Sequence, residues 1–192
     1  MNSVSAYEMH AREFLDARDR SAVGARVVAR WVRALSAGTD VIEIACGGGY
    51  PVTRTLVEAD INVWAIDSSP TLLERFRSRF PTIPTQCASA LESDYFGRQF
   101  GAAISIGLIF LLEAVEQVAL LRRVSEILLP EGRFLFTAPI ETGPWRDTTT
   151  GHECRSLGRA MYVEALESAG FCVLGTHVDE GKNNYYDVQK LR

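Results

Sequence analysis

A glycine-rich turn after a short apolar run, followed 20 residues later by an acid, constrains the fold of this chain more than any other sequence feature. Residues 41–46 read VIEIAC and lead into three consecutive glycines, 47–49. Pro51 then stands where the first turn of a helix tolerates a missing backbone N–H. Residues 61–67, INVWAID, form a second β-branched and aromatic run that ends on Asp67. These features predict two successive units of strand, turn and helix.

Strand and helix patterns alternate along the rest of the chain. Further strands are expected at residues 83–87, 102–107, 134–138, 171–178 and 185–191. A polar stretch at residues 141–151 follows the fifth strand, and the last helix stops at Gly170. The final two strands are joined by a turn-rich connection that suits an antiparallel hairpin. This order predicts an α/β fold with a doubly wound, seven-stranded, mostly parallel sheet whose C-terminal hairpin forms the far edge.

Two helices are expected before the first strand, at residues 7–18 and 22–35, and neither has a partner strand of its own. We therefore expect one domain over residues 1–192, with residues 1–36 as a helical N-terminal cover and residues 37–192 as the sheet core. Because the cover carries aromatic residues at helical spacing, we expect it to act as a mobile lid.

Composition narrows the class of partner. The chain has 20 Lys and Arg against 24 Asp and Glu, a formal net charge of −4, which argues against a nucleic-acid partner. The start of the chain is polar and charged, and no apolar run is long enough to span a membrane, so we expect a cytoplasmic protein without a membrane partner. The 4 cysteines and 3 histidines do not cluster, so no metal site is expected. The oligomeric state is left open.

The glycine turn and Asp67 together predict a binding site. In a doubly wound sheet both lie at carboxyl ends of neighbouring strands, where ligands bind. Small residues let the backbone approach a nucleoside, and a carboxylate accepts hydrogen bonds from both ribose hydroxyls. As alternatives, the glycines only make a tight turn and Asp67 only caps the next helix. The NAD fingerprint would need a third glycine where Val52 stands, so an NAD-dependent oxidoreductase is the second hypothesis. An inactive cofactor-binding protein is the third.

The segment at residues 43–49, EIACGGG, resembles motif I of the class I S-adenosylmethionine-dependent methyltransferases. Asp67 matches the ribose-binding acid of that family, and residues 100–108 and 128–134 resemble its fourth strand and its turn into the fifth strand. The resemblance covers most of the chain. It implies a Rossmann-like fold and a small-molecule methyltransferase that uses S-adenosylmethionine, releases S-adenosylhomocysteine and needs no metal. The acceptor atom would be nitrogen or oxygen.

The resemblance also implies which residues hold the cofactor. Glu43 and the loop backbone would bind its methionine end, Asp67 and Ser68 its ribose, and the amides after the third strand its adenine. The full set is Glu43, Ala45, Gly47, Gly49, Asp67, Ser68, Ala88, Ser89, Ile106 and Gly107. The chain departs from the family pattern where Ala45 replaces a glycine, and where Gly101 and Ala88 stand at positions that often carry acids.

Acceptor contacts are expected from segments outside the sheet. The candidates are Tyr7, Phe14, Phe110 and Trp145 for binding, and Asp147, His152 and His10 for catalysis. Each has an ordinary alternative. The histidines are also typical of surface positions, and the aromatic residues of core or loop-anchoring positions. Asp147 also suits a loop in which the aspartate bonds its own backbone.

Overall fold

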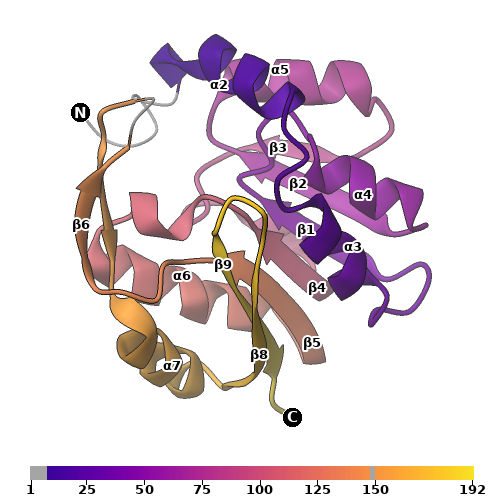
Figure 1. Cartoon of the computed structure of the whole chain (residues 1–192). Coiled ribbons are helices and arrows are strands. Elements are labelled where there is room, and N and C mark those ends of the chain that lie inside the picture. Colours follow the sequence, from indigo (N-terminus) through magenta and orange to yellow (C-terminus); the bar gives the residue numbers. More distant parts are fainter. Residues whose placement is uncertain (1–7, 148–149) are drawn as a thin grey trace.

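The computed structural model describes residues 8–147 and 150–192, and its centre is a seven-stranded sheet (Figure 1). The strand order is β3-β2-β1-β4-β5-β9-β8. The strands are β1 Asp40–Ile44, β2 Asn62–Asp67, β3 Thr85–Cys87, β4 Phe100–Ser105, β5 Leu128–Thr137, β8 Phe171–Val178 and β9 Asn184–Lys190. The first five are parallel, and β9 pairs antiparallel with both β5 and β8. The predicted sheet and its C-terminal edge hairpin are confirmed.

Helices cover both faces of the sheet (Figure 1). They are α2 Ala11–Asp19, α3 Ala25–Val32, α4 Val52–Glu58, α5 Pro70–Arg79, α6 Ala114–Ile127 and α7 Gly158–Ser168. On one face, α6 and α7 pack on side chains such as Ile42 and Phe136. On the other face, α3 and α4 pack on Val41 and its neighbours, and α5 packs on Ala65. Burial on both faces explains why the inner strands are continuously apolar.

The start of α5 follows the predicted capping pattern. Ser69 precedes the helix, its Oγ accepts a hydrogen bond from the N–H of Leu72 at 3.1 Å, and Pro70 occupies the first helical position. The Ser69 hydroxyl also donates to Glu8, which ties the N-terminal segment to this helix.

Replacing Ser69 with alanine is expected to lower the free energy of unfolding by about 1 kcal/mol, because one N–H at the start of α5 loses its acceptor. Urea unfolding at pH 7 measures this change. The matched control is Ser78→Ala on the same helix, where the exposed hydroxyl donates only to the Arg75 carbonyl. Equal effects of the two substitutions would contradict the capping role.

Two predictions about the fold were wrong. The polar stretch after β5 contains β6 Gly143–Arg146, which forms a separate antiparallel hairpin with β7 Glu153–Ser156. Its strands have four residues each, and most side chains of β6 are exposed, so the pattern of apolar and polar residues is too short to mark the hairpin. In addition, β5 begins at Leu128, six residues before the start that was expected at residue 134. Pairing between Leu128 and Phe100 extends this strand despite an irregularity in register.

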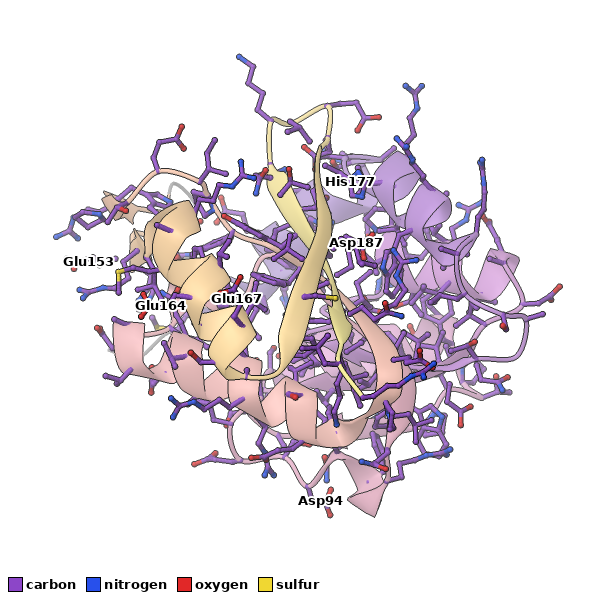
Figure 2. The ribbon with its side chains drawn as sticks, turned by 90° about the horizontal axis from the view of Figure 1, so that it is seen from below. Asp94, Glu153, Glu164, Glu167, His177 and Asp187 are labelled. Atoms are coloured by element: carbon purple, nitrogen blue, oxygen red, sulfur yellow. The ribbon has the colours of Figure 1, made fainter. Side chains whose placement is uncertain are left out.

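An ionic cluster joins the antiparallel strands. Figure 2 shows His177 of β8 close to Asp187 of β9, and His177 Nε2 lies 3.7 Å from Asp187 Oδ2. The same carboxylate accepts a hydrogen bond from Arg133 of β5. The cluster therefore links all three strands of this edge. Among the residues that the structure describes, no helix has the length and apolar character needed to cross a membrane.

Candidate functional site

A cavity of about 750 Å³ lies at the carboxyl ends of the parallel strands. This volume is typical of small-molecule sites. The order in which the chain adds strands reverses between β1 and β4, so the cavity occupies the switch point where ligands of doubly wound folds bind. It is lined by eight residues of the predicted cofactor set, namely Ala45, Gly47, Asp67, Ser68, Ala88, Ser89, Ile106 and Gly107.

Asp67 links the two loops that form the centre of this cavity. Its Oδ2 accepts a hydrogen bond from the N–H of Gly47 and its Oδ1 one from the N–H of Ser69, both at 2.8 Å. Burial raises the pKa of this carboxyl, and the backbone hydrogen bonds partly offset that effect. Each carboxylate oxygen can accept a further hydrogen bond. Asp67 therefore closes the Gly47 turn and lines the cavity, whereas the helix cap that was its alternative role is supplied by Ser69.

The three glycines have different roles. Gly47 lines the cavity and has a positive φ of 55°, which favours glycine. A Cβ on Gly48 would lie 2.4 Å from Leu15 of α2, and one on Gly49 would lie 2.4 Å from the Phe80 ring. Gly48 and Gly49 are thus needed so that Leu15 and Phe80 can pack against the loop. Gly49 does not line the cavity.

Glu43, the other predicted residue outside the cavity wall, is buried behind the loop. Only 4% of its surface is exposed, and the Thr53 hydroxyl donates a hydrogen bond to its Oε2 at 2.5 Å. Burial raises the pKa of Glu43 to about 8, and the nearby Asp67 charge adds to this effect. The carboxyl is therefore mostly protonated at neutral pH.

The helix α2 covers the glycine loop from outside (Figure 1). Asp19 at its end pairs with Arg79, and the Arg79 Nη1 donates to the Gly48 carbonyl at 2.9 Å. Phe14 and Arg18, one helical turn apart, line the cavity. Residues 1–7 are outside the described part of the chain, so the candidate Tyr7 cannot be placed on this helix.

Arg18 was not among the predicted site residues. It is the only arginine or lysine among the described residues that line the cavity. Burial lowers the pKa of its guanidinium, while the charge of Asp179 acts in the opposite direction. Its helical spacing from the predicted residue Phe14 puts it on the same face of α2, but the sequence does not indicate that this face covers the cavity.

The other end of the cavity is formed by the turn Ile109–Leu111 after β4, the start of α6, and the β6–β7 loop. The predicted residues Phe110, Asp147 and His152 line this end. Trp145 does not line it, and its ring packs against Phe110 with centroids 5.3 Å apart. His10 lies outside the cavity, with its Nδ1 3.6 Å from Glu13.

Backbone and side-chain hydrogen bonds fix the walls of this end. The Asp147 Oδ1 accepts from the Thr150 N–H at 2.7 Å and from its hydroxyl at 2.8 Å, as the own-loop interpretation predicts. The His152 Nε2 lies 3.2 Å from the Leu111 carbonyl oxygen. Thr137, which sequence patterns did not indicate, accepts from the Gly107 N–H at 2.7 Å and joins the ends of β4 and β5.

Known proteins are similar to this chain in sequence. Residues 41–132 match the family model described as a methyltransferase domain. A curated relative from Mycolicibacterium smegmatis, named a probable S-adenosylmethionine-dependent methyltransferase, is 28% identical over 143 residues. The match covers 73% of this chain and 54% of the relative, so the chain spans about half the length of that protein.

Solved structures share the fold. The 1,6-didemethyltoxoflavin-N1-methyltransferase of Burkholderia thailandensis, solved with 1,6-didemethyltoxoflavin and S-adenosylhomocysteine, has a TM-score of 0.80 at 17% identity, over 98% of this chain and 87% of its own. The N-methyltransferase NodS of Bradyrhizobium japonicum, solved with S-adenosylhomocysteine, has a TM-score of 0.69 at 16% identity, over 88% and 86%. At such low identities the comparison shows a likeness of fold alone. The TM-scores confirm the prediction of a Rossmann-like fold.

Proposed function

We propose that this chain, a member of the class I S-adenosylmethionine-dependent methyltransferases, binds S-adenosylmethionine in the cavity at the switch point. We further propose that it transfers the methyl group to nitrogen or oxygen of a small molecule. The observation that carries the proposal is the Asp67 carboxylate, which lines the cavity beside the Gly47 loop at the ends of adjacent strands. A carboxylate in this position suits the two hydroxyls of a ribose.

The residues present fit this cofactor along its length. Ser68 and Asp67 would hold the ribose, and the segment from Ala88 to Leu91 would hold the adenine. Arg18 would bind the carboxylate of the methionine part, because a guanidinium forms paired hydrogen bonds with a carboxylate. Ile106 and Gly107 would lie beside the sulfur.

The bound cofactor supplies a methyl group activated by its positively charged sulfur. Methyl transfer is a direct displacement, so the protein must align the acceptor atom and exclude water. Apolar walls at Leu108, Phe110 and Leu111 would serve the second task. We propose that the acceptor is a small molecule, because residues of α2 and the described loop residues Asp147 and His152 line the cavity on the side away from the strands.

The structure disfavours a dinucleotide in the same place. A pyrophosphate would need close access to the glycine loop and the start of α4. Leu15 and Arg79 already contact Gly48 there. The matched family model also describes a methyltransferase. Titration calorimetry of the full chain is therefore expected to show one site for S-adenosylhomocysteine and none for NADH. NADH binding without S-adenosylhomocysteine binding would refute the proposal.

Replacing Arg18 with alanine is expected to weaken S-adenosylhomocysteine binding by about 10- to 100-fold, the effect of losing a hydrogen-bonded charge partner. Methylthioadenosine lacks the carboxylate, so its affinity should be the same in the variant and the wild type. Arg12→Ala, an exposed position on α2, is the control. If Arg18→Ala lowers the affinity for both ligands equally, Arg18 does not bind the carboxylate of the methionine part.

A further inference from the structure

The orientation of His152 gives the acceptor end of the cavity a specific chemistry. His152, in the loop between β6 and β7, is one of the residues that line the cavity, and its Nε2 lies 3.2 Å from the Leu111 carbonyl oxygen. The His152 backbone is held on both sides, since its N–H donates to the Thr150 hydroxyl at 3.2 Å and its carbonyl accepts from the Asp147 N–H at 2.9 Å. The ring is thus tied to two elements, the loop and the turn after β4.

The contact with Leu111 determines which ring nitrogen carries the proton. A carbonyl oxygen only accepts hydrogen bonds, so the Nε2 of neutral His152 must bear the hydrogen. The Nδ1 then has a free lone pair and is the only ring nitrogen that can take up a proton. Asp147, the other candidate at this end, already has Oδ1 committed to two hydrogen bonds from Thr150.

We propose that the Nδ1 of His152 accepts the proton of the acceptor molecule, and that the nucleophile is therefore an N–H or O–H group on a molecule with an apolar body. This inference rests on the proposed function. The lone pair of the nucleophile forms the bond to the methyl carbon, the carbon–sulfur bond breaks, and its electron pair stays on sulfur. The proton of the nucleophile passes to Nδ1 and from there to solvent, since His152 is half-buried.

The surroundings of His152 support a proton acceptor. Two acids, Asp147 and Glu116, line the same end of the cavity. The charge of Glu113, which also lines it, is shared with Arg155 at 3.4 Å. Burial raises the pKa of Cys154, whose thiol lies 3.8 Å from the His152 carbonyl, to about 11, so this neighbour stays neutral.

The first test does not need a known acceptor. The test is a long-range proton–nitrogen NMR spectrum of the protein labelled with nitrogen-15. The chain has only 3 histidines, and the signals that disappear in His152→Gln belong to the ring of His152. The neutral ring is expected to carry its hydrogen on Nε2. A neutral ring with the hydrogen on Nδ1 would overturn the proposal, whether or not the protein binds S-adenosylhomocysteine. Calorimetry with that ligand tests the proposed function separately.

The second test uses activity. The glutamine in His152→Gln can still donate to the Leu111 carbonyl, but it cannot take up a proton. Against a panel of phenols, amines and ring N–H compounds, kcat for the best acceptor is expected to fall by about 10²- to 10⁴-fold. In His152→Gln, KM and the affinity for S-adenosylhomocysteine should equal those of the wild type. The decrease of kcat at low pH that is expected for the wild type should be absent from the variant. His177→Gln, away from the cavity, is the control.

Two outcomes of this activity test would overturn the proposal. One is an unchanged kcat with an unchanged pH profile in His152→Gln. The other is a best acceptor that has no removable proton, such as a tertiary amine or a thioether. If no compound in the panel is methylated, the NMR result alone decides the proposal.

Discussion

Replacing Asp67 with asparagine is expected to weaken S-adenosylhomocysteine binding at least 100-fold. Hydrogen bonds to a charged group contribute about 1.5–3 kcal/mol each, and a ribose would form two of them with this carboxylate. The substitution also disturbs the loop. Oδ1 and Oδ2 each accept from a backbone N–H, at Ser69 and Gly47, so either orientation of the asparagine places its amide group against an N–H donor.

Titration calorimetry measures this loss, and circular dichroism with urea unfolding shows whether the variant is folded. Asp94→Asn is the matched control, because this exposed aspartate also accepts from the backbone of its own loop, at Phe96, but lies outside the cavity. Figure 2 shows it at the edge of the molecule. Undiminished binding in a folded Asp67→Asn protein would refute the assignment of the ribose site.

The sheet could be predicted from the sequence because its signals are local. Runs such as residues 41–46 and 61–67 are apolar on both faces, and the glycine and serine turns that follow them determine where each helix starts. The β6–β7 hairpin could not be predicted, because its side chains also pack on residues that are distant in the sequence. Cys154 is buried there, while Trp145 packs against Phe110 of a different segment.

The candidate site also contains residues that could be predicted from the sequence and residues that could not. Residues at the ends of parallel strands, such as Asp67 and Gly107, converge through strand order alone. Arg18 enters the cavity only because α2 packs across the glycine loop, and no local pattern specifies that packing. Gly49 shows the opposite error, since a glycine expected to face the cofactor instead makes room for Phe80.

Glu43 is expected to make the stability of the protein depend on pH between about 4.5 and 8. Its pKa rises from the ordinary 4.5 to about 8 in the folded protein, chiefly through burial. In this range the unfolded chain has released the proton and the folded protein keeps it, so the free energy of unfolding falls as pH rises. A difference of this size corresponds to roughly 3–5 kcal/mol across the range.

Glu43→Gln removes the titrating group and keeps a neutral acceptor for the Thr53 hydroxyl. The variant is therefore expected to lose less stability than the wild type between pH 5 and pH 8, and to be the more stable of the two at pH 8 by about 3 kcal/mol. Urea unfolding of the ligand-free proteins at several pH values measures both curves. Glu58→Gln, an exposed glutamate paired with Arg54, is the control and should follow the wild type. If the wild-type and Glu43→Gln curves run parallel, Glu43 is ionised in the folded protein, and its buried charge must then be balanced by Arg18.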